Sequence, residues 1–143
     1  MGATQSIKSA NYEDLQIACN SNEYIIINTI NTTHQDCLVK STLSCHKEEE
    51  ILNNLMKTNK NVKIIIYGLN CNDETIYKKY HHLIKCGFIY VFIYIGGLFE
   101  WLCLQDIYGE ELFPTTKKEL DILKYKPVSF LNQKHITNYA YNS

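Results

Sequence analysis

The sequence predicts an α/β fold with a central parallel sheet, and three observations indicate it. Segments of strand and helix character alternate along the chain, which is typical of parallel strands joined by helical crossovers. The strand segments Tyr24–Ile27 and Val62–Tyr67 are apolar runs without polar alternation, as expected of strands covered on both faces. Gly68 follows the second of these strands, and Gly87 ends the next predicted helix. The length of 143 residues matches one domain.

The first half of the chain opens with a short tail at residues 1–6, after which Ser9 is predicted to be a helix N-cap. Apolar spacing, β-rich runs and acidic first-turn residues then predict four elements. They are a helix at Ala10–Cys19, a strand at Tyr24–Ile27, a short strand at Thr42–Cys45 and a helix at Glu48–Thr58.

The second half contains the strongest strand signal, Val62–Tyr67, which we expect in an interior position of the sheet. A polar loop at Leu69–Glu74 follows it. The remaining predicted elements are a helix at Thr75–Cys86, a strand at Val91–Ile95 and a helix at Leu98–Tyr108. We place the domain at residues 7–125 and a C-terminal tail or docking strap at residues 126–143.

Charge and composition limit the function classes. The net charge of −1 gives no indication of a nucleic-acid partner. All fourteen basic residues are lysines, which is typical of an AT-rich coding genome. The protein therefore lacks the bidentate guanidinium group that proteins commonly use to hold an oxyanion.

The six cysteines are predicted to be reduced thiols, because no secretory signal precedes them. We therefore expect a cytoplasmic protein. No Cys-x-x-Cys spacing is present, so neither a metal site nor a cofactor is predicted. The longest apolar stretch, Phe88 to Leu104, is interrupted by Gly96, Gly97 and Glu100 and is too short to span a membrane.

The segment Ile64–Trp101 resembles the second half of a rhodanese-like domain. Its hydrophobic strand Ile64–Tyr67, the loop, the helix ending at Gly87-Phe88 and the Gly96-Gly97-x-x-x-Trp101 motif follow the family order. Upstream, residues 7–15 and 25–28 are similar to the family's opening strand, first helix and second strand. The resemblance covers roughly residues 7 to 114. It implies a three-layer α/β/α fold with a central parallel sheet of about five strands.

The sequence departs from the family pattern at two places. The family has an Asp at the end of its second strand and an Arg two residues later, where this chain has Asn28 and Ile30. The family nucleophile is a Cys directly after the central strand, where this chain has Gly68. The nearest loop cysteine is Cys71, which is therefore the candidate catalytic residue.

The loop that the resemblance marks as the active site is poor in cations. Asp73 and Glu74 would repel anionic donors such as thiosulfate and disfavour the Cys71 thiolate. We therefore expect an inactive module that binds or scaffolds, and keep as the alternative a sulfurtransferase that carries sulfur on Cys71. A phosphatase-like relative is a third interpretation, against which the absence of arginine argues. The loop consists of Gly68, Leu69, Asn70, Cys71, Asn72, Asp73 and Glu74.

The N-terminus matches the N-myristoylation pattern, with Gly2 as the acceptor and Ser6 at the required spacing. One myristoyl chain binds membranes only marginally, and the single nearby cation is Lys8. The alternative is a disordered tail without modification. We expect an unknown protein partner and weak membrane association through the lipid, and the sequence indicates no oligomeric state.

Overall fold

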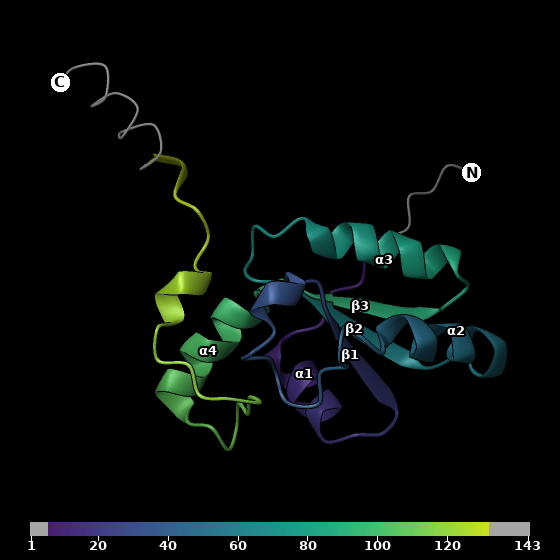
Figure 1. The fold of residues 1–143 in the computed structure, drawn as a ribbon, viewed down its shortest axis with the longest axis horizontal. Helices are drawn as coiled ribbons and strands as arrows, with labels where there is room; N and C mark the ends of the chain where they lie inside the picture. The colour runs from purple at the N-terminus through teal and green to yellow at the C-terminus, as the bar shows by residue number, and fades with distance from the viewer. Residues whose placement is uncertain (1–5, 132–143) are drawn as a thin grey trace.

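A computed structural model describes residues 6–131 and contains a three-stranded parallel sheet in the order β1-β2-β3 (Figure 1). The strands are β1 (Tyr24–Asn28), β2 (Lys63–Tyr67) and β3 (Tyr90–Tyr94). Ile26 is paired with Ile65, which in turn is paired with Phe92. The strand predicted at Val62–Tyr67 therefore occupies the centre of the sheet, as expected.

The sheet has three strands and not the five that the family resemblance implies. Ser9 forms a single parallel bridge with Ile93 of β3, and Thr42 forms one with Ile26 of β1. Both extra segments are cut short by turn chemistry, because Asn11 caps a helix and Ser44 accepts a turn hydrogen bond from Lys47. The two expected edge strands are therefore reduced to bridges.

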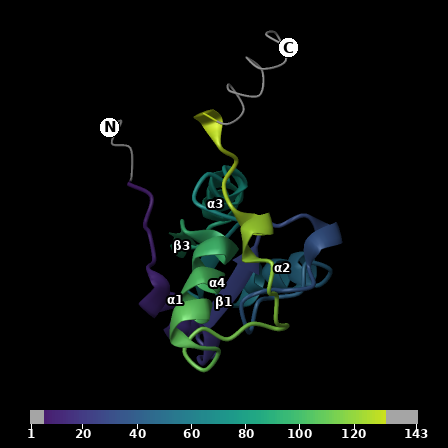
Figure 2. The same ribbon diagram turned by 90° about the vertical axis from the view of Figure 1, so that its left-hand side faces the viewer.

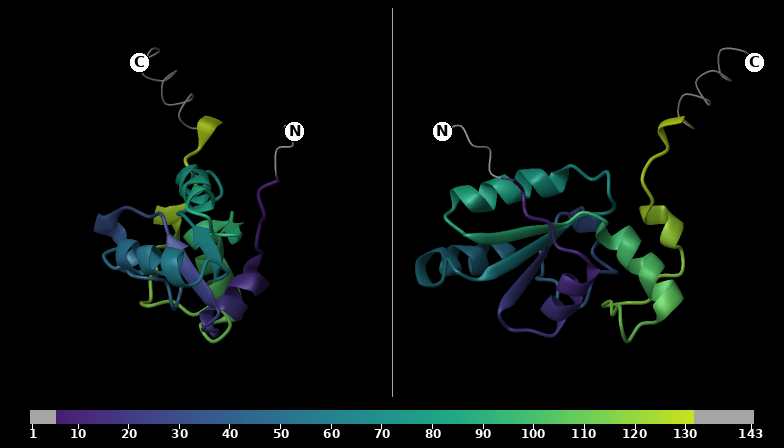
Figure 3. Two further views of the ribbon diagram at one scale, coloured as in Figure 1. Left: turned by 90° about the vertical axis from the view of Figure 1, so that its right-hand side faces the viewer. Right: turned by 180° about the vertical axis from the view of Figure 1, so that it is seen from behind.

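Helices cover both faces of the sheet and give three layers, which Figures 1 and 3 show from opposite sides. Successive strand residues point to opposite faces. Ile64 and Ile66 accordingly pack with α2 (Glu48–Thr58) and α3 (Thr75–Lys85). Ile65 and Tyr67 pack on the other face with α1 (Tyr12–Cys19) and α4 (Gly97–Tyr108). Two short 3-10 helices, η1 (Thr32–His34) and η2 (Ile122–Tyr125), complete the described elements.

The first helix begins later than predicted. Asn11 is the N-cap, with a capping box in which the Asp14 amide donates to Asn11 Oδ1 and the Asn11 amide donates to Asp14 Oδ2. Ser9 is extended instead, because the backbone at residues 8–10 pairs with Ile93. None of the helices within residues 6–131 has the length and apolar character needed to cross a bilayer.

Trp101 is buried in the core between α4 and the segment that follows it. Its ring makes an edge contact with Phe113 at a centroid distance of 5.0 Å, and its Nε1 donates to the Pro114 carbonyl at 3.0 Å. Leu102 is buried beside it, and Phe99 and Leu104 pack partly buried against the same cluster. These aromatic and aliphatic contacts hold residues 113–114 against α4.

Candidate functional site

The loop between β2 and α3 lies at the carboxyl edge of the parallel sheet, where ligands bind in open α/β sheets. Its first residue, Gly68, is buried, and the Gly68 and Leu69 carbonyls accept hydrogen bonds of 2.9 Å from the first amides of α4, those of Leu98 and Phe99. The first amides of α4 thus bind the loop backbone.

Gly97 permits that close approach. It has a φ of 68°, and a Cβ there would lie 2.6 Å from the Asn70 amide nitrogen and 2.7 Å from the Gly68 carbonyl oxygen. An L side chain would therefore collide with the loop backbone as well as adopting a strained conformation. The Gly-Gly motif works here as a turn onto a helix that packs on the loop.

The carboxylate of Asp73 folds back into the loop. Its Oδ2 accepts from the Leu69 amide at 2.9 Å, and its Oδ1 accepts from the Thr75 amide at 3.0 Å and the Thr75 hydroxyl at 2.5 Å. The carboxylate also covers Gly68, since a Cβ on Gly68 would collide with Asp73 Oδ2. An internal anion therefore already occupies the place where a side chain directly after the central strand would begin.

Asn70 ties the loop to the C-terminal part of the chain. Its Nδ2 donates to the Tyr125 carbonyl at 2.9 Å, and its Oδ1 accepts from the Asn72 amide at 3.0 Å. The Asp73 amide donates to the Asn70 carbonyl at 3.1 Å. The amides of Asn72 and Asp73 therefore already donate to acceptors of the chain itself.

A groove runs beside the loop between α3 and the start of α2. It has a volume of about 570 Å³ and lies against the end of β1, where the hydroxyl oxygens of Thr29 and Thr75 are 2.7 Å apart. An ion pair of 2.5 Å between Lys79 and Glu48 spans the two helices. A second hollow of about 490 Å³ continues along the same helices and shares Cys45, Glu48, Lys79 and His82 with the first.

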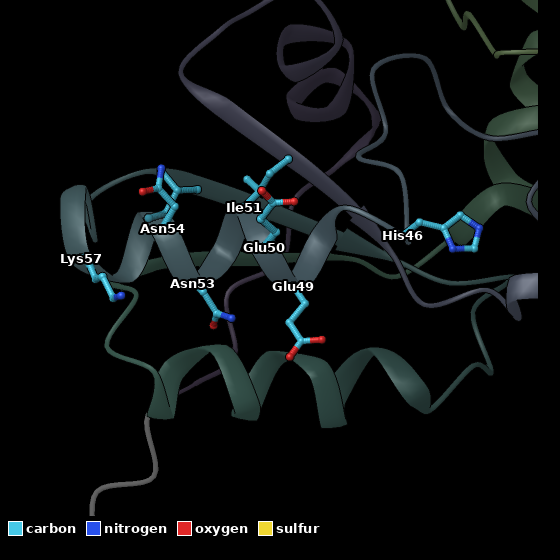
Figure 4. A pocket seen from close by; sticks show the side chains of 8 residues that line it. His46, Glu49, Glu50, Ile51, Asn53, Asn54 and Lys57 are labelled. Carbon is cyan, nitrogen blue, oxygen red and sulfur yellow. The ribbon is translucent and has the colours of Figure 1, made fainter.

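Another hollow lies away from the loop, on α2. It follows the exposed surface of α2 and measures about 790 Å³. Figure 4 shows His46 and Lys57 near opposite ends of α2, and Glu49 directed toward α3. The polar groups do not converge on a common point, so this surface is a poor ligand site.

No protein-family model matches the sequence, and no curated protein matches it. Solved structures do match. The rhodanese-like domain of the Alr3790 protein from Anabaena sp. is similar with a TM-score of 0.54 at 20% identity, covering 87% of each chain. The BH2092 protein from Bacillus halodurans is similar with a TM-score of 0.59 at 18% identity, covering 89% of this chain and 88% of that one. The single-domain sulfurtransferase RDL2 from Saccharomyces cerevisiae has a TM-score of 0.50 at 14% identity, covering 78% of this chain and 99% of its own.

The chain has the rhodanese-like fold. In this chain the cysteine candidate does not occupy the position after the central strand. Cys71 is an exposed loop residue, and its Sγ contacts Asn72 Oδ1 at 3.8 Å. The structure brings Gly68, Asn70 and Asp73 together through hydrogen bonds and contacts, and it leaves Cys71 at the surface.

The first departure from the family pattern has a structural substitute that the sequence did not indicate. Asn28 and Gln35 form a reciprocal amide pair, with Gln35 Nε2 donating to Asn28 Oδ1 at 2.8 Å and Asn28 Nδ2 donating to Gln35 Oε1 at 3.1 Å. Asn28 Oδ1 also accepts from the Ile30 amide at 3.0 Å. A neutral pair thus ties the end of β1 to the following turn.

All the cysteines of residues 6–131 are free thiols, and two of them, Cys19 and Cys37, are buried. Burial raises the pKa of Cys19 to about 11, and burial followed by nearby Glu119 raises the pKa of Cys37. Both side chains belong to the core. Across residues 6–131, no group of three or more His, Cys, Asp and Glu side chains is placed to hold a metal ion.

The two helical histidines lie on the exposed surface of α3. His82 Nε2 is 3.9 Å from Cys86 Sγ, one turn along the helix, and the His81 ring meets Tyr80 edge-on. The lipidation candidate Gly2 lies outside the described residues.

Asp73 and Tyr125 are the site residues whose roles the sequence analysis missed. Asp73 precedes Thr75 by two positions, and this Asp-x-Thr spacing is a local signal for a side chain that caps its own turn. Tyr125 contributes a backbone carbonyl from a distant segment, which no local pattern indicates.

Proposed function

We propose that this rhodanese-like module is catalytically inactive and acts in binding or scaffolding. The observation that carries the proposal is the Asp73 carboxylate, which accepts hydrogen bonds from the Leu69 and Thr75 amides and covers Gly68. An anionic sulfur donor would have to displace this carboxylate or approach against its charge. No arginine exists in the chain to offset that repulsion.

The direct test is turnover of thiosulfate with cyanide by the full chain. We expect no rate above the uncatalysed background, and no difference between the wild type and Cys71→Ser. Cys45→Ser is the matched control for loss of a thiol outside the loop. Turnover that Cys71→Ser abolishes and Cys45→Ser preserves would refute the inactive assignment.

The alternative is a sulfurtransferase, which the exposure of Cys71 favours. In that reaction the Cys71 thiolate attacks the outer sulfur of thiosulfate, the sulfur–sulfur bond breaks and sulfite leaves with the electron pair. Cyanide then takes the outer sulfur from the persulfide, giving thiocyanate and the regenerated thiolate. Mass spectrometry of the protein after incubation with thiosulfate would detect a persulfide on Cys71.

The binding surface that we assign to a protein partner is the groove between α2 and α3. It is lined by Asn28 at the carboxyl end of β1, and it presents Lys78 and His82 beside the Glu48–Lys79 ion pair. Partners captured by photocrosslinking from this groove should be lost with Lys78→Glu/His82→Ala. They should be retained with Lys57→Glu/His46→Ala, which makes the same chemical changes on the outer surface of α2.

We further propose that the module is N-myristoylated at Gly2, on the pattern formed with Ser6. Coexpression with the acyltransferase should increase the intact mass by one myristoyl group, and Gly2→Ala should prevent the increase. An unmodified wild-type mass under conditions that acylate a known substrate would exclude the modification.

A further inference from the structure

A stretch near the end of the described chain, residues 117–131, combines firm attachment with unusual exposure of apolar side chains; we call it the apolar strap. Its attachment is specific. Tyr125 is buried, its carbonyl accepts from Asn70, and the Lys117 carbonyl accepts from Cys37 Sγ at 3.2 Å. Ile122 packs partly buried against the core. The strap is thus fixed to the body of the domain near its start and in its middle.

Five other large apolar side chains of the strap are nevertheless exposed. The exposed fraction is 82% for Leu120 and 64% for Leu123, and the C-terminal part of the strap continues this exposure. Leaving such side chains in water forgoes the free energy that their burial would contribute. The other exposed apolar side chains of the strap are Val128, Phe130 and Leu131.

Lysines are interspersed with these apolar side chains. The strap has four lysines and only two acidic residues, although the whole chain carries a net charge of −1. Lys118 pairs with Glu110 and Lys124 pairs with Glu119, which leaves Lys117 and Lys126 without an ion pair in the described chain. The strap is therefore a cationic and apolar region on a protein that is slightly anionic.

The composition of the strap distinguishes between two kinds of binding partner, a second protein and a lipid bilayer. The cores of protein–protein interfaces are depleted in lysine. Segments that lie on a bilayer combine apolar side chains, which enter the acyl boundary, with lysines, which contact anionic headgroups. The mixture of exposed leucines and lysines in the strap therefore favours a lipid surface over a second protein.

The position of the strap supports the same occupant. Residues 126–131 extend away from the helices in each view, and they do so on the α3 side of the molecule (Figures 1 and 2). The segment that begins at Ser6 leaves the body on this side too (Figure 2). One flat surface could therefore face both described ends of the chain.

We propose that the apolar strap is a membrane-docking element that binds bilayers containing anionic phospholipid. This proposal rests on the proposed binding role and adds a lipid bilayer as a binding partner. The strap would also supply the second membrane-binding signal that a single acyl chain at Gly2 needs. The strap acts without the acyl chain, so protein with an unmodified Gly2 tests it separately from acylation and from catalytic inactivity.

The test is cosedimentation of the full, unacylated chain with phosphatidylcholine vesicles that contain or lack phosphatidylserine. We expect retention on the anionic vesicles that weakens as salt is raised. Leu120→Ser/Leu123→Ser should lower the partition coefficient by about tenfold or more. Ile17→Ser/Ile107→Ser, which removes two exposed isoleucines outside the strap, should leave it unchanged.

Charge is tested separately with Lys117→Gln/Lys126→Gln, which should lower partition by about tenfold and flatten its salt dependence. The proposal is overturned if anionic vesicles do not retain the wild type or if the strap variants partition like the wild type. A concentration-dependent dimer in analytical ultracentrifugation that Leu120→Ser/Leu123→Ser abolishes, without vesicle binding, would assign the strap to a second copy of the chain instead.

Discussion

The side-chain amide of Asn70 donates a hydrogen bond of 2.9 Å to the carbonyl oxygen of Tyr125, 55 residues further along the chain. Asn70 is buried, and its other side-chain atom, Oδ1, accepts from the Asn72 amide. One side chain therefore shapes the loop after the central strand and also fastens η2 (Ile122–Tyr125) to it. Loop and strap should respond together to changes at this residue.

Asn70→Ala should destabilise the fold, because it leaves the buried Tyr125 carbonyl without this donor. The expected loss is about 1–3 kcal/mol in the free energy of unfolding, measured with urea. Asn72→Ala is the matched control, since the Asn72 side chain is exposed and contacts the exposed Cys71 thiol. Equal stability of the two variants would show that the Asn70 contact contributes little.

Gly68→Ala should also be destabilising, because its new methyl group would collide with the Asp73 carboxylate. Moving Asp73 away breaks its bonds to Leu69 and Thr75, at a cost of about 1–3 kcal/mol. In an Asp73→Ala background the same glycine substitution should cost distinctly less. A double-mutant cycle with urea unfolding measures this coupling, and additive effects would contradict the contact.

Trp101→Ala should lower the free energy of unfolding by about 3–5 kcal/mol, the usual cost of truncating a buried large aromatic side chain. Trp101 is fully buried and also donates to Pro114. Tyr108→Ala removes a mostly exposed ring from the same helix and should cost far less. A loss under about 1 kcal/mol at Trp101 would be inconsistent with its burial.

The free energy of unfolding should decrease at alkaline pH because of the ionisation of the Cys19 thiol. Burial raises its pKa to about 11, so the folded protein keeps a proton that the unfolded chain releases above about pH 9. The contribution of Cys19 is therefore complete below pH 9 and is lost as the pH rises toward 11, by up to about 2–3 kcal/mol. Burial also raises the pKa of Tyr67, which extends the loss to higher pH.

Urea unfolding at a series of pH values checks this dependence. Cys19→Ala should remove the part of the alkaline loss that belongs to Cys19, whereas Cys71→Ser, at an exposed position, should not change it. If both variants show the same pH dependence as the wild type, the ionisation of Cys19 is not coupled to unfolding.

Local patterns in the sequence were sufficient to predict the three strands of the sheet and most helices. The apolar run at Val62–Tyr67 predicted the central strand. When helices cover both faces of a sheet, the residues that point to either face are apolar, so the strand shows no polar alternation. The helix Glu48–Thr58 was predicted with the observed bounds. Such features depend on side-chain periodicity within one element and so are readable without the fold.

Features that depend on distant contacts were not predicted. Ser9 and Asn11 are both good N-cap residues, and pairing of the preceding backbone with Ile93 decides between them. The position of Cys71 in the loop was known, but the cover of Gly68 by the Asp73 carboxylate depends on a side-chain conformation. The amide pair of Asn28 with Gln35 likewise depends on how the turn folds.

The single bridges at the two sides of the sheet bear on aggregation. A three-stranded sheet presents two rows of backbone groups to neighbouring chains unless something covers them. Ile93 is covered by Lys8 and Ala10, with hydrogen bonds of 3.0 and 2.8 Å, and Ile26 is covered by Leu43 at 2.8 Å. A protein truncated to begin after Ala10 would uncover the apolar strand β3, and its edge could template pairing between chains.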